Sequence, residues 1–418
     1  MEYTQNEVLQ YVKDNDVRFI KLFFTDIFGR IRSLNIQPVE LPQAFKTGIP
    51  FDASLSEGFL NMTYSDLFVV PDPNTLCVLP WRPQQGRVVR FFCNIRYPDG
   101  SLFEGDTRSM LANAVKDAEK AGYECLFGTK CEFYLFKRDL DGRATREPHD
   151  FAGYCDLAPL DAGENIRREI CLTLSKMGIE PLRSYHEAGP GQHEVDFRSA
   201  CGVDAADNVN TFKTVVRTVA ANSGLFASFL PMPVEDAIGS GFYVNLAIKK
   251  DGKNLFEGGT LSETGGAFVA GVLNRVVEIA AFLNPLPSSY KRLGHNDAPL
   301  SVSWTRQNHI GQLIRIPFPA GEEEHIEVRA ADPSCNPYLA ITLLLRAGLE
   351  GIENKESIIP AAEDLRSEAS WTFGTLPSTL EAARKVAAKS KFVRSVLGDA
   401  IVKAYTETDA EEPEFGIV

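Results

Sequence analysis

The pattern of apolar and polar positions divides the chain into two parts. In residues 1–102, short apolar runs such as 18–24 and 76–81 alternate with the turn clusters PDPN and YPDG, which is typical of strands joined by tight connections. From residue 103 onward, longer stretches with helical spacing alternate with β-like segments such as CEFYLF and GFYVNLAI. The pattern predicts an α+β protein with a small β-rich domain over residues 1–102 and a larger domain over residues 103–418.

The second part holds several predicted helices. The helical periods cover residues 110–121, 164–176, 209–222, 267–283 and 337–350, and residues 377–406 hold one or two more amphipathic helices. The last dozen residues are acidic and turn-prone, so we expect the tail to be disordered. The common nucleotide motifs G-x-G-x-x-G and G-x-x-x-x-G-K-[ST] are absent, so any ATP site must be of another design.

The net charge and the cysteines narrow the choice of partner. The 418 residues carry a formal net charge of -13, which disfavours binding to nucleic acid or to an anionic membrane. We see no run approaching about 18 apolar residues and no secretory signal at the N-terminus. The eight cysteines form no C-x-x-C pair, which indicates reduced thiols. We therefore expect a cytoplasmic protein that binds a small molecule.

Three glutamates form a candidate metal site. Glu132 lies in the apolar segment CEFYLF, which we interpret as a strand, and a buried carboxylate there requires a cation or another partner. Glu187 and Glu194 flank the Gly-Pro-Gly turn of HEAGPGQHEVDFR, which can bring their carboxylates together. Carboxylate oxygens suit Mg²⁺ or Mn²⁺. Taken singly, each glutamate is more simply explained as a solvated or salt-bridged residue.

A second polar group lies on alternating, strand-like segments near the C-terminal side of the predicted domain. Arg315 is in QLIRIP, and Glu327 and Arg329 are in HIEVRAADPSCNPY, so all three side chains could point into one cavity. Arginine suits bidentate capture of a carboxylate or phosphate. For either arginine alone, a surface ion pair is the simpler explanation.

The motifs in order along the chain resemble the bacterial type I glutamine synthetase family. The resemblance extends over nearly the whole sequence and rests on FDASLSEGF, SDLFVVPDPNT, FEGDTR, CEFYLF, GYCDLAPLD, HEAGPGQHEVDFR, GSGFYVN, NPLPSSYKRL and EVRAADPSCNPYLA. It implies an N-terminal β-grasp domain and a catalytic domain with an antiparallel sheet flanked by helices. It also implies a homo-oligomer built as a hexameric ring, with two stacked rings left open, in which Asp52 reaches the active site of the adjacent subunit.

The resemblance also implies a reaction. In the family, ATP phosphorylates the γ-carboxylate of glutamate and ammonia displaces the phosphate, with the help of two divalent ions. By the resemblance, Glu132, Glu187 and Glu194 match the ligands of the first ion. Of the second ion's ligands only Glu327 remains, because Lys130 stands in the E-x-E motif and Tyr243 in the G-S-G-x-H motif. We expect Lys130 to pair with Glu327 and replace part of the missing charge.

Further departures fall on the same expected pocket. His309 stands where the family's N-R-S motif has arginine, His325 stands where a phosphate-binding arginine is expected, and Ile238 replaces an asparagine. Asp297 stands in the shielding loop where the family has glutamate. The resemblance thus implies catalytic roles for Asp52, Asp297, Arg315 and Lys130; substrate binding by Arg292, Arg329, His309, Tyr243 and Gly239; nucleotide binding by His325, Arg315 and Asn245; and metal binding by Glu132, Glu187, Glu194 and Glu327.

Three functions remain open at this stage. The first is an ATP-dependent ligase that joins a carboxylate to an amine other than ammonia, forming a γ-glutamyl amide or a related amide. The second is an ATP-independent amide transferase or hydrolase that uses one Mg²⁺ or Mn²⁺ ion. The third is a non-catalytic, ligand-binding or regulatory homologue. Each of them takes an amino acid or amine as its small-molecule ligand, and ATP use separates the first from the others.

Overall fold

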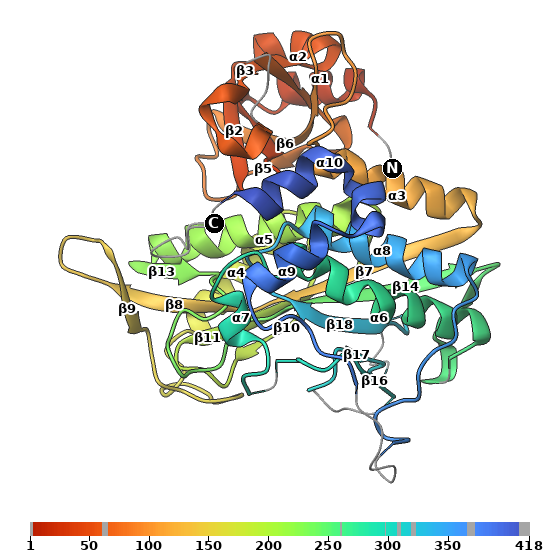
Figure 1. Cartoon of the computed structure of the whole chain (residues 1–418). Coiled ribbons are helices and arrows are strands. Elements are labelled where there is room, and N and C mark those ends of the chain that lie inside the picture. The colour runs from red at the N-terminus through yellow and green to blue at the C-terminus, as the bar shows by residue number, and fades with distance from the viewer. Residues whose placement is uncertain are drawn as a thin grey trace. The chain divides into compact units, whose positions relative to one another are not determined.

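The computed structural model describes residues 3–60, 66–259, 261–296, 298–306, 311–318, 323–365 and 373–408. The chain forms two compact units, which are residues 1–110 with 175–178, and residues 111–174 with 179–418 (Figure 1). Helix α3 (Thr107–Lys120) carries the chain from the first unit into the second. The β-sheets and helices of these units confirm the predicted α+β class.

The first unit is built on a mixed β-sheet. Its strand order is β2-β1-β6-β4-β3, with β5 paired to β6, and its two longest strands, β1 and β6, run parallel. A parallel pair needs a long crossover connection, which here includes the other strands and helix α2. The elements are β1 (Val17–Thr25), β2 (Ile31–Ile36), β3 (Ile49–Asp52), β4 (Asp66–Pro71), β5 (Cys77–Val78), β6 (Arg87–Arg96), α1 (Gln5–Asp14) and α2 (Leu41–Thr47).

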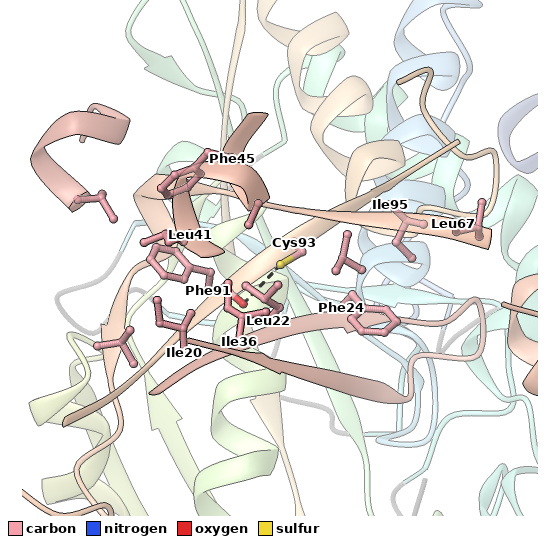
Figure 2. Packing of buried hydrophobic residues seen from close by; sticks show 14 of the residues in the cluster. Ile20, Leu22, Phe24, Ile36, Leu41, Phe45, Leu67, Phe91, Cys93 and Ile95 are labelled. Carbon is pink, nitrogen blue, oxygen red and sulfur yellow. Dashed lines mark hydrogen bonds between the residues drawn. The ribbon is translucent and has the colours of Figure 1, made fainter. Parts of the chain in front are cut away.

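The core of the first unit follows from period-two alternation in its strands. Ile20, Leu22 and Phe24 of β1 are buried, because every second side chain of a strand points to the same face. Phe91 of β6 joins this face and packs edge-on against Phe45 of α2, with ring centroids 5.9 Å apart (Figure 2). The sheet therefore buries one face under α2.

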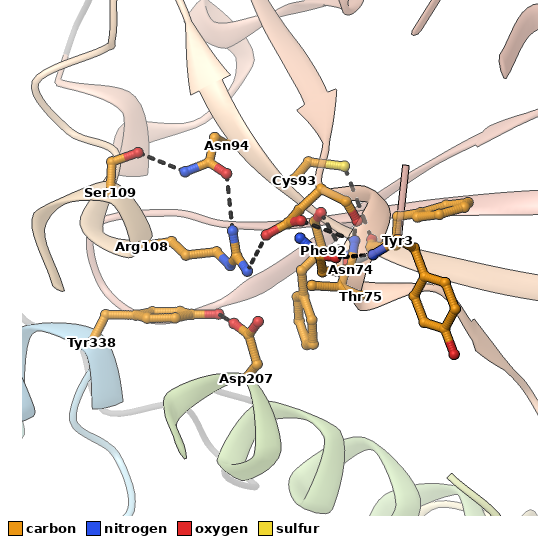
Figure 3. A network of polar contacts seen from close by, with 12 residues as sticks. Tyr3, Asn74, Thr75, Phe92, Cys93, Asn94, Arg108, Ser109, Asp207 and Tyr338 are labelled. Atoms are coloured by element: carbon orange, nitrogen blue, oxygen red, sulfur yellow. Dashed lines mark hydrogen bonds and ion pairs between the residues drawn. The ribbon is translucent and has the colours of Figure 1, made fainter. Parts of the chain in front are cut away.

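A polar network ties the start of α3 to the sheet of the first unit (Figure 3). Arg108 is 5% exposed, and its guanidinium donates to Asp72 Oδ2 and Asn94 Oδ1, both at 2.9 Å. Asn94 in turn donates to Ser109 Oγ at 2.6 Å. A buried arginine is tolerated only when its donors are satisfied, and these contacts supply that condition.

The second unit contains two further sheets in the part of the chain that the structure describes. One has the order β12-β7-β14-β18-β17-β16 with β15 on β14, and the other has the order β10-β11-β8-β13 with β9 on β8. The strands are β7 (Tyr123–Cys131), β8 (Phe133–Arg138), β9 (Ala144–Pro148), β10 (Pro181–His186), β11 (Gln192–Phe197), β12 (Ala200–Cys201), β13 (Leu225–Ser228), β14 (Phe242–Lys250), β15 (Lys253–Asn254), β16 (Trp304–Thr305), β17 (Ile314–Arg315) and β18 (Ile326–Ala331).

The predicted helices of the second unit are present, with shifted ends. Two helices lie in the segment 377–406, where one or two were predicted, and the tail from residue 409 lies outside the described residues. The helices are α3, α4 (Glu164–Lys176), α5 (Asp204–Asn222), α6 (Glu263–Leu283), α7 (Ser289–Arg292), α8 (Pro337–Glu353), α9 (Leu380–Ala387) and α10 (Lys391–Glu407). A buried hydrogen bond from Tyr338 Oη to Asp207 Oδ1 links α8 to α5 (Figure 3).

Helix α6 corrects one expectation from the sequence. By length and composition alone it could cross a membrane, although we expected no such stretch, but 78% of its apolar window is buried inside the protein. It packs on α8 through Gly271 and Gly351, where an added Cβ would come within 2.2 Å of a backbone oxygen of the facing helix. The apolar character of α6 is therefore explained by its place in the core of the unit.

Candidate active site

Glu132 lies at the point where the chain passes from one sheet of the second unit to the other. Strand β7 ends at Cys131 and β8 begins at Phe133, and the two strands belong to different sheets. The expectation that Glu132 lies inside one continuous strand was therefore wrong. The backbone of Glu132 still donates to Gly241 O at 3.1 Å, so this residue is held firmly at the junction.

The other two glutamates approach Glu132 through a hairpin. Strands β10 and β11 are antiparallel, with His186 opposite His193, and Glu187 N donates to Gln192 O at 2.8 Å across the turn. Gly191 in this turn has φ +66°, a conformation that favours glycine. The hairpin brings Glu187 and Glu194 to Glu132, so that one carboxylate oxygen from each lies within 4.8 Å of the others. We call these three residues the carboxylate cluster.

Electrostatics in the carboxylate cluster favour a bound cation. Burial, together with the charge of Glu132, raises the pKa of Glu187 to about 8. Burial and the neighbouring Asp196 raise the pKa of Glu194 well above its ordinary value. A divalent ion would relieve this repulsion, and carboxylate oxygens are the ligands that Mg²⁺ and Mn²⁺ prefer. The residues present therefore fit such an ion.

Beside this cluster, Glu327 is surrounded by three cations of the chain. It is fully buried and contacts Lys130 Nζ at 2.9 Å, Arg315 Nε at 2.5 Å and Arg329 Nη1 at 2.8 Å. Burial alone would raise the pKa of Glu327, but the three cations outweigh it and hold this pKa well below its usual range. The charge of Glu327 is thus balanced by side chains of the protein itself. We call Lys130, Arg315 and Arg329 the cationic triad.

The reach of Lys130 explains its contact. Strand β14 lies between β7, which carries Lys130, and β18, which carries Glu327. Neighbouring strands are about 4.8 Å apart, so the side chains must bridge roughly 10 Å. The long lysine stem spans that distance over β14 and places its ammonium group on the carboxylate.

Tyr243 connects the carboxylate cluster with the cationic triad. Its hydroxyl donates to Glu132 Oε1 at 2.8 Å and accepts from Arg329 Nη2 at 3.3 Å. The Arg329 guanidinium also lies over the Tyr243 ring, 4.1 Å from its centroid, a favourable cation–π geometry. Burial and the charge of Glu132 raise the pKa of Tyr243 well above its usual range, so this hydroxyl remains a donor.

A pocket lies along the sheet that contains β7, β14 and β18. It has a volume of about 590 Å³, within the range of roughly 300–1,000 Å³ for small-molecule sites. Leu126 of β7 and Lys249 of β14 contribute to its walls. Because side chains alternate along a strand, Leu126 lies on the same face of β7 as Lys130, and Lys249 lies on the same face of β14 as Tyr243. Its lining consists of Leu126, Arg198, Ser199, Lys249, Gly252, Asn254, Glu257, Glu323 and Glu324.

Two of the residues predicted for nucleotide binding lie near this pocket. Asn245 is buried between Gly128 and Glu327 in the sheet register, and its Oδ1 has no hydrogen-bond partner among the described residues. His325 directly follows the pocket residues Glu323 and Glu324, and its Nδ1 lies 2.7 Å from Glu323 O.

The remaining predicted residues differ in their surroundings. Arg292 is 2% exposed and donates to the backbone carbonyls of Ala330 and Ala331 at 2.9 and 3.1 Å. Gly239 lies against the stem of Arg292, where an added Cβ would come within 2.5 Å. Asp52 is exposed and accepts from Ser54 in the first unit. The expected residues His309 and Asp297 lie outside the described residues.

A second buried group consists of Asp150, His186 and His193, and its possible ligand atoms also lie close enough together to hold a metal ion. These residues are, however, engaged in hydrogen bonds within the protein. His186 Nε2 contacts Asp150 Oδ1 at 2.8 Å, and its Nδ1 contacts Glu187 O at 2.6 Å. The guanidinium of Arg167 donates to His193 Nδ1 at 2.9 Å. Both nitrogens of His186 thus face acceptors, and a cation already touches His193, so this group acts as support for the hairpin.

The sequence reading missed three residues that contact the cluster or its neighbours. Gln192 Nε2 donates to Glu132 Oε2 at 3.3 Å, and Tyr185 Oη donates to Glu194 Oε1. Asp196, next to Glu194, pairs with Arg183 at 2.6 Å. A hairpin assumed around the Gly-Pro-Gly turn could have indicated Tyr185, because the numbers of two residues that face each other in a regular hairpin add up to a constant, as they do for His186 with His193 and for Tyr185 with Glu194.

Comparisons with known proteins agree with this geometry. The family model described as glutamine synthetase, catalytic domain, matches residues 104–415, and the glutamine synthetase β-grasp domain model matches residues 16–98. A glutamine synthetase of Clostridium saccharobutylicum is 40% identical, covering 98% of this chain and 95% of that protein. A glutamine synthetase of Methanosarcina mazei is 42% identical, and the match covers 96% of this chain and 92% of that protein.

Solved structures give the same result. A protein designated GmaS, in complex with ADP, has a TM-score of 0.85 and 27% sequence identity, with 96% of this chain and 94% of that chain covered. The structure of GmaS without ligand has a TM-score of 0.84 with this chain. The full-length agreement in sequence, the two matched domains and the geometry of the carboxylate cluster show that this chain is a member of the glutamine synthetase family.

Proposed function

We propose that this chain is an ATP-dependent carboxylate–amine ligase that uses one tightly held divalent ion and an amine other than ammonia. The observation that carries the proposal is the carboxylate cluster, with its three oxygens within 4.8 Å, beside a Glu327 site that Lys130 occupies at 2.9 Å. The first feature can hold an ion, and the second supplies fixed positive charge where another ion would otherwise be needed.

In this proposal Glu132, Glu187 and Glu194 hold Mg²⁺ or Mn²⁺, which polarises the bound acid and stabilises developing charge. Gly241 N, at 2.7 Å, and Tyr243 Oη, at 2.8 Å, each donate to a different oxygen of Glu132 and so fix the orientation of its carboxylate. Orientation of this kind makes a ligand set rigid enough to position a substrate.

The cationic triad gives the site its affinity for phosphate. Lys130, Arg315 and Arg329 carry three positive charges against the one negative charge of Glu327. The surplus favours a phosphoryl group in transfer, which bears negative charge on its outer oxygens. The triad can therefore stabilise the transfer without a second metal ion.

The pocket of about 590 Å³ is our candidate for the nucleotide. Its wall residues Leu126 and Lys249 lie on the sheet that carries the cationic triad, and Asn245, whose Oδ1 has no hydrogen-bond partner among the described residues, lies on strand β14 of that sheet. The similar GmaS structure was solved with ADP, which supports nucleotide binding by this chain.

Tyr243 and Ile238 support an amine larger than ammonia. Tyr243 places an aromatic ring between the carboxylate cluster and the triad, and Ile238 receives a hydrogen bond on its carbonyl from Tyr134 Oη. The aromatic ring of Tyr243, and an aliphatic residue at position 238 where the resemblance leads us to expect asparagine, favour an amine that carries an apolar substituent. We also propose that the protein acts in the cytoplasm as a homo-oligomeric ring in which Asp52 serves a neighbouring copy.

One observation favours an alternative. Each cation of the triad already contacts Glu327, so a triphosphate would have to compete with an internal carboxylate. If that competition fails, the same carboxylate cluster would serve an ATP-independent amide transferase or hydrolase with one ion.

The two functions are separated by an ADP-release assay on the Mn²⁺-loaded protein with glutamate and a panel of primary amines, alongside calorimetric titration with ATP. We expect saturable ATP binding and ADP release that depends on one of the amines, and no release by the Glu187→Gln variant, which loses a cluster ligand. Absence of ATP binding at millimolar concentration, with amide turnover in its absence, would favour the alternative.

A further inference from the structure

Strand β10 is the edge strand of its sheet, and two of its side chains, Tyr185 and Arg183, contact carboxylates of the adjacent strand β11. Tyr185 is directly opposite Glu194 on β11, and Arg183 is directly opposite Asp196. Residues two apart on a strand point to the same face. Tyr185 and Arg183 therefore reach two neighbouring carboxylates of β11 from the same side.

The contacts of these pairs are specific. The hydroxyl of Tyr185 donates to Glu194 Oε1, and the guanidinium of Arg183 contacts Asp196 Oδ2 at 2.9 and 2.6 Å. Arg183 neutralises Asp196, whereas Tyr185 adds no charge to Glu194. The role of Tyr185 is therefore directional: it engages one oxygen of a carboxylate that is only 1% exposed.

The ring of Tyr185 is itself supported. Tyr154 packs against it edge-on, with ring centroids 5.7 Å apart and an angle of 76° between the planes. Cys155 N donates to His186 O at 3.0 Å and fixes the same segment to β10. With its ring held on one side and its hydroxyl bonded on the other, Tyr185 has little freedom to leave Glu194.

We propose that Tyr185 is a positioning residue for metal binding, which fixes the carboxylate of Glu194 so that it can face the ion held with Glu132 and Glu187. This inference rests on the proposed metal site. Outer hydrogen bonds of this kind orient a ligand and usually change metal affinity by about 10- to 100-fold when they are removed. Tyr185 touches neither the ion nor the substrate in this role.

The test is Tyr185→Phe in the full-length chain, with Mn²⁺ affinity measured from the free-ion signal in electron paramagnetic resonance. We expect the dissociation constant to rise about tenfold, and the spectrum of the bound ion at saturation to broaden, because Glu194 is less well ordered. Tyr97→Phe is the matched control, since it removes a similar hydrogen bond, from Tyr97 Oη to Glu104 at 2.9 Å, in the first unit; it should leave both readouts unchanged.

The outcomes distinguish this inference from the proposal on which it rests. If the unaltered protein binds Mn²⁺ tightly and Tyr185→Phe binds it equally well with the same spectrum, the positioning role is refuted while the metal site stands. If the unaltered protein binds no Mn²⁺, both are refuted. Thermal melting of the two variants checks that each is folded. Tyr154→Ala, which removes the edge-on contact with the Tyr185 ring, should give a smaller loss of affinity in the same direction.

Discussion

The exchange of Lys130 and Tyr243 for metal ligands provides the sharpest test of the second site. In the double variant Lys130→Glu with Tyr243→His, a carboxylate, an imidazole and Glu327 would come from the three adjacent strands β7, β14 and β18. These groups suit a divalent ion. We expect the variant to bind one Mn²⁺ ion per chain more than the unaltered protein.

The magnitude follows from charge and distance. A divalent ion about 4 Å from the Lys130 ammonium would be repelled by about 8 kcal/mol, taking an effective dielectric constant of about 20. That energy corresponds to more than five orders of magnitude in affinity, at about 1.4 kcal/mol for each factor of ten. Because Glu327 already contacts three cations, the unaltered protein offers an ion no compensation at this position.

The assay is metal content by mass spectrometry after dialysis against Mn²⁺, with a spectroscopic titration to obtain each dissociation constant. Lys130→Met and Tyr243→His serve as single-variant controls, since each leaves the set of ligands incomplete and should add no tightly bound ion. Two tight ions per chain in the unaltered protein would refute the reasoning, as would a double variant that is folded but gains none.

Two predictions concern pH. Burial and the charge of Glu132 raise the pKa of Glu187 to about 8, so this carboxyl must lose a proton to bind metal. The affinity for Mn²⁺ should therefore increase by up to about tenfold for each pH unit between pH 6 and 8. An affinity that does not change with pH would contradict this. The pKa of Asp150 is about 2, because the hydrogen bond and charge of His186 outweigh burial. This pair therefore stabilises the fold above the ordinary pKa of Asp150 and loses that effect as pH falls toward 2. The difference in melting temperature between the protein and Asp150→Asn should accordingly shrink from pH 5 to pH 2, and a constant difference would contradict the assignment.

The structure brings together several residues that the motifs had selected, but their surroundings have no comparable signal in the sequence. The three glutamates of the carboxylate cluster were selected as a set through the resemblance, and the Gly-Pro-Gly turn limits how far apart Glu187 and Glu194 can lie. The position of Glu132 between two sheets could not be read from CEFYLF, because an apolar run does not show where the chain changes partner strands. The buried contacts of Arg292 with backbone carbonyls likewise depend on how α7 packs, which has no local signal.

Two contacts show where the limit of sequence reasoning lies. The pairing of Lys130 with Glu327 was predicted through the resemblance, although the two residues are two strands apart in the sheet and about 200 positions apart in the sequence. The periodicity within either strand does not show which distant strand it will lie beside. The contact of Tyr185 with Glu194 is the opposite case. Once Glu187 and Gln192 close the turn, antiparallel pairing places His186 opposite His193 and therefore Tyr185 opposite Glu194. Local geometry was sufficient for that contact, and applying hairpin register to each candidate ligand would recover such supporting residues from sequence.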